Sequence, residues 1–226
     1  EVDRPSAQDF QINPVTPAKA KGAIELGGSK IVGEVKPLDV NYARQLYGSN
    51  AVLRTLAPGE PGLLQVSNYN CHVEVTRVHI LRGTGRSYPE QALRGAAALE
   101  GHVIPGEGMT PKGYFFLIQR AGGKAWAADT NIRGLKAVAK AGYFVELTVK
   151  TLGGGRHSVE FRGFIERAGV EHAVFGDPYF GSEIALPTCD FLKVWAFEAR
   201  LTGKIQVADF GQASPLSVFA DAPSVK

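Results

Sequence analysis

The sequence predicts a mainly β fold: an antiparallel sandwich or barrel-like domain with two or three short helices and extended termini. Segments rich in β-branched and aromatic residues, bounded by glycine and proline clusters, predict about nine or ten strands. These strands outnumber the helical segments and do not alternate with them, which disfavours a parallel βαβ sheet. The chain has 226 residues, of which 44% are hydrophobic and 21% charged, enough to bury one sizeable core. We therefore expect a single β-rich domain over residues 22–210.

The two ends of the chain are predicted to be extended. Residues 1–21 carry three prolines and few large apolar groups, and residues 211–226 carry two prolines and many small residues. Proline interrupts helices and central strands alike, so we expect an N-terminal arm and a C-terminal tail. Extended arms often grip a neighbouring chain, although frayed ends are the commoner explanation.

The strands are expected, in chain order, at residues 23–26, 31–36, 63–67, 71–81, 112–119, 143–152, 156–167, 170–175, 192–199 and 205–210. The glycines at 153–155 separate two well-alternating segments, which predicts a hairpin between 143–152 and 156–167. The segment 112–119 is apolar on both faces and is expected at the centre of a sheet.

Three segments are expected to be helical. Residues 42–56 have helix-compatible spacing, interrupted by Gly48. A better helix is expected over residues 87–100, with Ser87 as N-cap and Gly101 after its end. A third could start at Asp129 or Thr130 and continue to residue 140.

Charge is unevenly distributed along a chain whose net charge is only +3. Basic residues predominate from Lys112 to Arg167, and acidic residues predominate from Glu171 to Asp221. Such an asymmetry could bind nucleic acid through the basic region or bring like subunits together. The alternative is two ordinary solvated faces.

A metal site is considered at His72 and Glu74. Residues two apart on a strand share a face, so both side chains point the same way on the predicted strand 71–81. Further ligands would have to come from His157, Glu160 or His172. The alternative is a histidine that is hydrogen-bonded or on the surface.

An anion site is considered at Arg82, Gly83, Gly85, Arg86 and Ser87. These residues lead from the predicted strand 71–81 into the N-terminus of the best predicted helix, where backbone N–H groups and two arginines would favour phosphate. The spacing matches neither a dinucleotide fingerprint nor a P-loop. The alternative is a glycine loop with solvated arginines.

Two other features are noted. Tyr179 and Phe180 lie in the loop 176–181 and are expected to be exposed aromatic contacts. Cys71 and Cys189, the two cysteines of the chain, could form a disulfide or be free thiols.

No nucleophile motif or cofactor motif is present, so catalytic residues stay unassigned and no cofactor is predicted. The leading hypothesis is a non-enzymatic structural subunit that assembles with copies of itself or with partners, in a virion or an extracytoplasmic apparatus. The alternative is a small-molecule- or metal-binding β-barrel protein or enzyme with its site near His72 and Glu74 or at Arg82–Ser87. No apolar run is long enough to predict a membrane span.

Overall fold

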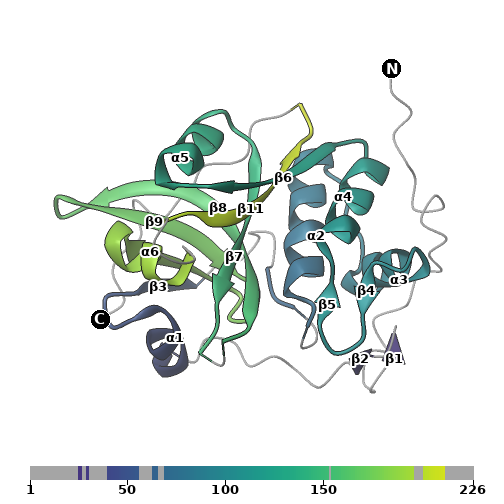
Figure 1. Cartoon of the computed structure of the whole chain (residues 1–226), viewed down its shortest axis with the longest axis horizontal. Helices are drawn as coiled ribbons and strands as arrows, with labels where there is room; N and C mark the ends of the chain where they lie inside the picture. Colours follow the sequence, from purple (N-terminus) through teal and green to yellow (C-terminus); the bar gives the residue numbers. More distant parts are fainter. Residues whose placement is uncertain are drawn as a thin grey trace.

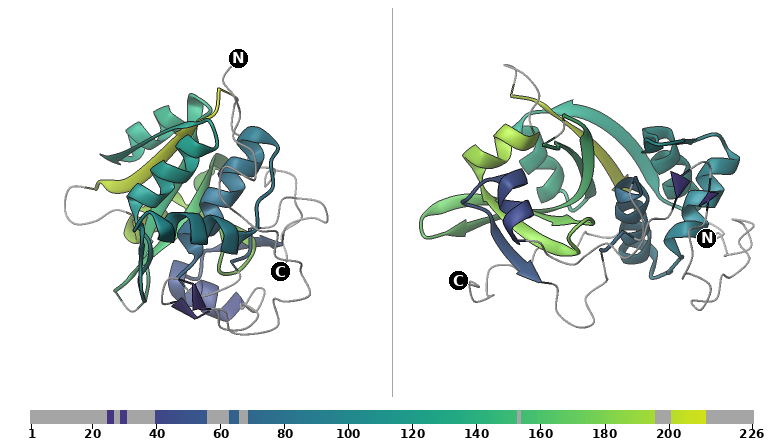
Figure 2. Two further views of the ribbon diagram at one scale, coloured as in Figure 1. Left: turned by 90° about the vertical axis from the view of Figure 1, so that its right-hand side faces the viewer. Right: turned by 90° about the horizontal axis from the view of Figure 1, so that it is seen from below.

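The predicted mainly β class is confirmed by the structure, a computed structural model that describes residues 25–26, 29–30, 40–55, 63–65, 69–152, 154–195 and 201–211. Its centre is a seven-stranded antiparallel sheet in the order β3-β10-β9-β8-β7-β11-β6. The strands are β3 (Val52–Thr55), β6 (Lys124–Thr130), β7 (Phe144–Lys150), β8 (Arg156–Arg167), β9 (Val170–Asp177), β10 (Ser182–Pro187) and β11 (Gly203–Asp209). The sheet is curved but not closed, and β3 and β6 are its edges (Figure 2).

Helices cover both faces of this sheet (Figure 1). The described residues form α1 (Val40–Tyr47), α2 (Cys71–Thr84), α3 (Glu90–Leu99), α4 (Pro111–Arg120), α5 (Ile132–Lys140) and α6 (Thr188–Trp195). One apolar core lies between the sheet and α1, α5 and α6, and a second joins α2, α3 and α4 to the sheet. Two short hairpins complete the fold: β1 (Glu25–Leu26) with β2 (Ser29–Lys30), and β4 (Val103–Ile104) with β5 (Gly108–Met109).

Several predicted elements are confirmed. Strands β7 and β8 form the predicted hairpin, and β9 and β11 match the strands expected at 170–175 and 205–210. Helix α3 lies within the predicted 87–100. Helix α5 is also present, but its N-cap is Asn131, whose side chain accepts the N–H of Gly134 at 3.1 Å. Strands β6 and β10 were not predicted.

Helix α2 replaces the strand predicted over residues 71–81. It packs against the sheet, α3 and α4, so most of its side chains are buried, polar ones included. A helix buried on most sides shows no clear amphipathic period, and its β-branched residues imitate a strand. Gly85 ends it in the left-handed conformation, with φ of 72°.

Two further predicted strands are also helices. The apolar run at 112–119 lies in α4, whose start is marked by Thr110 as N-cap and Pro111 in the first turn. A short apolar run fits a buried helix as well as a buried strand, so the pattern alone could not separate them. The strand expected at 192–199 overlaps the end of α6, and residues 196–199 lie outside the described part.

The remaining predictions differ in their bounds or fall outside the structure. The helix expected at 42–56 ends at Tyr47, because Gly48 takes φ of 96°, and β3 follows. Residues 63–65 are not a strand. The predicted arm 1–21, the segment 31–36 and the tail beyond Gly211 lie outside the described residues.

Three buried glutamates lie in a row across the sheet, on the face toward α2. Glu146 on β7 is directly opposite Glu160 on β8, and Glu160 and Glu183 on β10 are both opposite Gly176 on β9. Directly opposed residues share a face, so the three carboxylates point the same way. We call Glu146, Glu160 and Glu183 the carboxylate row. Their exposed fractions are 0%, 2% and 0%.

Buried carboxylates require cationic partners, and the row obtains them from the helix and from the sheet. Arg82 of α2 donates to Glu160 at 2.7 Å. Arg162 contacts Glu160 and Glu183, each at 3.0 Å, and Arg54 donates to Glu183 at 2.7 Å. Glu146 lies 3.1 Å from His72 Nε2 at the other end of α2. The row therefore attaches both ends of α2 to the sheet.

His79, in the middle of α2, is a second buried histidine of this helix. It is fully buried, and its Nδ1 lies 2.9 Å from the hydroxyl of Tyr114. Burial lowers its pKa to about 4. An unfolded histidine titrates near pH 6.5, so the unfolded chain binds more protons between these two values.

We predict that His79 makes the protein less stable as the pH falls from about 6.5 toward 4. The free energy of unfolding should decrease over this range by up to about 3 kcal/mol, because the folded state excludes the proton. The measurement is urea denaturation at several pH values. His79→Gln should flatten the slope, and the control His102→Gln should keep it. An unchanged slope in His79→Gln would contradict this account.

Candidate active site

Cys71 is the first residue of α2. The first N–H groups of a helix have no acceptor within the helix, and the positive end of the helix dipole favours an anion such as a thiolate. The start of the helix is fixed by the buried Asn70. Its side chain binds Glu90 and accepts from Arg94 at 2.5 Å, both from α3. The thiol of Cys71 is therefore held in place by two packed helices.

His157 and Asp177 reach Cys71 from the sheet. They lie on the neighbouring strands β8 and β9, and His157 Nε2 is 2.7 Å from Asp177 Oδ1. The positive charge of His157 also acts on the thiol of Cys71 and lowers its pKa. Because Nε2 faces Asp177, the nitrogen left for the sulfur is Nδ1. Cysteine, histidine and aspartate thus form a connected triad.

The carboxylate of Asp177 is fully buried and has further donors. The hydroxyl of Tyr47 on α1 donates to Oδ2 at 2.5 Å, and the backbone N–H of Tyr179 donates to Oδ1 at 2.8 Å. These bonds stabilise the ionised carboxylate and fix its orientation. Asp177 can therefore set both the direction and the charge of the His157 ring.

The surroundings favour a charged pair at Cys71 and His157. Burial alone would raise the pKa of the Cys71 thiol, but the charge and hydrogen bond of His157, the N–H of Ser158 and the charge of His72 lower it. Burial alone would lower the pKa of His157, but Asp177 and Cys71 raise it well above its usual value. The two pKa shifts run in opposite directions, so each favours a thiolate–imidazolium pair over the neutral one.

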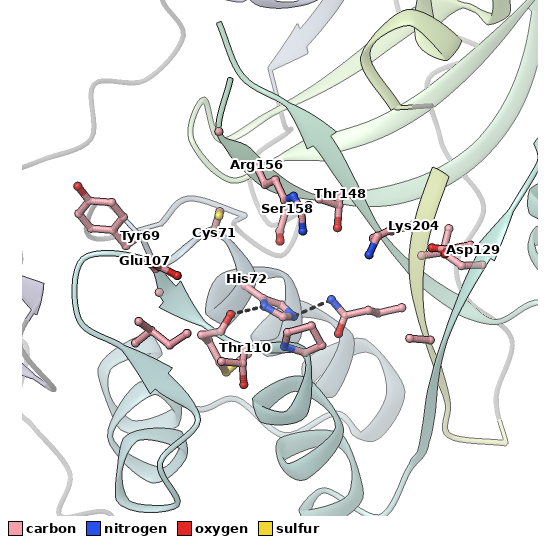
Figure 3. A pocket seen from close by; sticks show the side chains of 18 of the residues that line it. Tyr69, Cys71, His72, Glu107, Thr110, Asp129, Thr148, Arg156, Ser158 and Lys204 are labelled. Atoms are coloured by element: carbon pink, nitrogen blue, oxygen red, sulfur yellow. Dashed lines mark hydrogen bonds between the residues drawn. The ribbon is translucent and has the colours of Figure 1, made fainter. Parts of the chain in front are cut away.

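Cys71 lines a cavity of about 700 Å³ between the helical side and the sheet. Figure 3 shows Tyr69, Glu107 and Thr110 on one side and Thr148, Arg156, Ser158 and Lys204 on the other. The helical wall includes the β4–β5 hairpin, and the sheet wall includes residues of β6, β7, β8 and β11. A cavity of this size admits several residues of an extended substrate.

Gln65 lies close to the triad along the backbone. It is 3% exposed, and its N–H donates to the carbonyl of Pro178, the residue after Asp177, at 2.9 Å. The N–H groups at the start of α2 are the type of donor that stabilises an oxyanion.

The predicted pair His72 and Glu74 is not brought together, because residues 71–81 form a helix rather than a strand. His72 points to the Met109 carbonyl, 2.8 Å from Nδ1, and to Glu146, whereas Glu74 binds Arg77 at 2.7 Å. Among the described residues, no three metal-ligating side chains converge. The strand on which the metal pair was placed is a helix, and the metal site itself stays a prediction.

The predicted anion segment Arg82, Gly83, Gly85, Arg86 and Ser87 runs from the C-terminal end of α2 into the residues before α3. A helix, and not the expected strand, precedes it. Arg82 is paired with Glu160, and Gly85 is the helix C-cap. The C-terminal end of a helix carries the negative end of the dipole, which disfavours an anion. Anion binding there stays a prediction without a supporting contact.

Two remaining expectations have mixed outcomes. Tyr179 is 37% exposed, as expected, but Phe180 is 1% exposed and belongs to the core. Cys71 and Cys189 are both free thiols, so the open question of a disulfide is answered in favour of the alternative.

The triad itself was not predicted. His157 follows the glycines at 153–155 at the start of a strand, and Asp177 ends a strand before Pro178, but only the pairing of β8 with β9 brings them together. The available signal was Asn70-Cys71-His72, a polar cap residue followed by a nucleophile. It would have identified the site if the segment had been recognised as a helix start.

Comparison of the sequence with models of known protein families and with curated proteins finds no match. A function must therefore be proposed from the geometry of the site. Within the described residues, no helix combines the length and hydrophobicity needed to cross a membrane.

We predict that Cys71 reacts with iodoacetamide as a thiolate at pH 6. In a Cys189→Ser background Cys71 is the only thiol, so the alkylation rate reports its ionisation directly. His157→Asn should move the pKa of Cys71 back toward that of an ordinary thiol, near 8.5, and thus lower the rate at pH 6 by about tenfold or more. The check is the pH–rate profile from pH 4 to 10. Equal profiles with and without His157 would exclude the ion pair.

Proposed function

We propose that this protein is a cysteine hydrolase that cleaves amide bonds of peptides through a covalent intermediate on Cys71. The observation that supports it most is the chain of contacts from Cys71 through His157 to Asp177, at the edge of a cavity of about 700 Å³. Such a triad is recognised by its geometry and not by its fold or by the order of its residues.

In the proposed first step, the thiolate of Cys71 attacks the carbonyl carbon of the scissile bond. The oxygen that becomes negative is stabilised by N–H groups at the start of α2. The His157 imidazolium gives its proton to the leaving nitrogen, the carbon–nitrogen bond breaks and an amine departs. A thioester between the substrate acyl group and Cys71 remains.

In the second step, neutral His157 takes a proton from water, and the resulting hydroxide equivalent attacks the thioester. The carbon–sulfur bond breaks, a carboxylic acid departs, and Cys71 and His157 return to the thiolate and imidazolium forms. Asp177 keeps the ring oriented throughout, because its carboxylate holds Nε2 while Nδ1 exchanges the proton.

A peptide is favoured as substrate because the leaving group of an amide needs a proton. The stable form of His157 is the imidazolium, which supplies that proton. The cavity is also lined by β6, an edge strand of the sheet, and an edge strand can pair with an extended chain.

The assembly hypothesis rests on the arm 1–21 and the tail 211–226, which lie outside the described residues apart from Gly211. It stays a prediction, as does nucleic-acid binding through the region from Lys112 to Arg167. Neither gains a supporting contact from the described part of the chain.

The proposal predicts cleavage of a mixed library of internally quenched peptides, measured by fluorescence. Cys71→Ala should abolish cleavage, and Asp177→Asn should lower the rate by about a hundredfold. The control Cys189→Ala, which changes the exposed cysteine far from the triad, should keep full activity. Cleavage that survives Cys71→Ala, or no cleavage of any library member and no reaction with a peptide chloromethyl ketone, would contradict the proposal.

A further inference from the structure

A second charged pair lies directly beside the nucleophile. His72 follows Cys71 on α2 and lines the same cavity, yet only 8% of its side chain is exposed. Its ring stacks on Tyr114 of α4, with centroids 5.7 Å apart. The triad does not use His72, so its burial next to the nucleophile calls for an explanation.

The hydrogen bonds around His72 determine its charge. Nδ1 lies 2.8 Å from the carbonyl oxygen of Met109, which can only accept, so Nδ1 carries a proton. Nε2 lies 3.1 Å from the carboxylate of Glu146. A proton on Nε2 makes the ring an imidazolium, which is the form that both neighbours stabilise.

The carboxylate of Glu146 is stabilised by the positive charge of His72. It is 0% exposed, and neither of its carboxylate oxygens has a hydrogen-bond partner among the described residues. The described ion pair of Glu146 is the one with His72. A buried carboxylate without a cation is strongly unfavourable, so the pair is charged or neutral as a unit.

Gln206 of β11 fits this assignment when its side-chain amide is turned. Its Nε2 lies 3.0 Å from His72 Nε2, while its Oε1 is buried without a hydrogen-bond partner in the described part of the chain. Turning the Gln206 amide by half a turn exchanges its Nε2 and Oε1 atoms. The acceptor Oε1 then faces the N–H donor at His72 Nε2. His72 then donates from Nε2, as an imidazolium must.

We propose that His72 and Glu146 form a second imidazolium–carboxylate pair, whose fixed positive charge beside Cys71 keeps the nucleophile ionised. His72 is thus a positioning residue that acts on the substrate through Cys71. This inference deepens the proposed function and rests on Cys71 being its nucleophile.

The direction of the pKa shifts agrees with the contacts. Burial would lower the pKa of His72, but Glu146, Met109 and Cys71 raise it to about 9. The charge of His72 in turn lowers the pKa of Cys71. Tyr114 from α4 and His79 on the same helix also lie near His72, and Glu107, Asp129, Arg156 and Lys204 line the same cavity. Burial raises the pKa of Tyr114 and lowers that of His79, so neither competes for the charge.

The test measures the apparent pKa of Cys71 from the pH dependence of iodoacetamide alkylation in the Cys189→Ser background. His72→Gln should raise this pKa by about one unit, which moves the midpoint of the pH–rate profile upward by the same amount. The double variant His72→Gln with Glu146→Gln should lie between wild type and His72→Gln, because it also removes the uncompensated carboxylate. If His72 and Glu146 had a merely structural role, the double variant would show the largest change in the pKa of Cys71.

The matched control is Glu74→Gln, which breaks the other buried ion pair in the first turn of α2. It should leave the pKa of Cys71 unchanged. If His72→Gln fails to fold, nitrogen-15 NMR of His72 in the wild-type protein decides instead. Both ring nitrogens should be protonated at pH 7, and a neutral ring there would overturn the proposal.

Failure of this inference can be told apart from failure of the proposed function. If peptides are cleaved but His72→Gln leaves the pKa of Cys71 unchanged, the inference alone is wrong. If no peptide is cleaved but the predicted order of pKa values is found, the charged pair stands and the assignment of the substrate is wrong.

Discussion

Helix α2 and the sheet are held together by charges that neither element can bury alone. The carboxylate row, Glu146, Glu160 and Glu183, is almost fully buried, so each member requires a cation within reach. Arg82 and His72, at opposite ends of α2, supply two of these cations. The helix is therefore fixed at two points about 15 Å apart along its axis, which limits both sliding and rotation on the sheet.

The arrangement at the site follows from this constraint. Glu160 and His157 lie three residues apart on β8, so the contact that fixes one end of α2 is on the same strand as the contact at Cys71. The sheet supplies His157 and Asp177, α1 supplies Tyr47, and α2 supplies the thiol. The cavity opens at Cys71, where helical side and sheet meet.

Much of the fold could be predicted from the sequence, but the site could not. The glycines at 153–155 and the alternating residues beside them were enough to predict the β7–β8 hairpin, because turn and strand signals there are local. The sequence pattern of α2 did not predict a helix. A helix whose polar residues are also buried shows neither an apolar period nor a separate polar face. The site also depends on strand pairing, which places Asp177 next to His157 and Glu146 opposite Glu160. Such contacts between distant residues leave no short motif in the sequence.

The charge of His157 is the quantity on which the account depends most directly. Nitrogen-15 NMR of the imidazole can report whether one or both ring nitrogens are protonated, and a comparison with Cys71→Ala shows how far the sulfur contributes. The account predicts a doubly protonated ring at pH 7 in the wild-type protein, with a lower pKa when the thiolate is removed. A neutral His157 ring at pH 7, insensitive to the loss of Cys71, would contradict it.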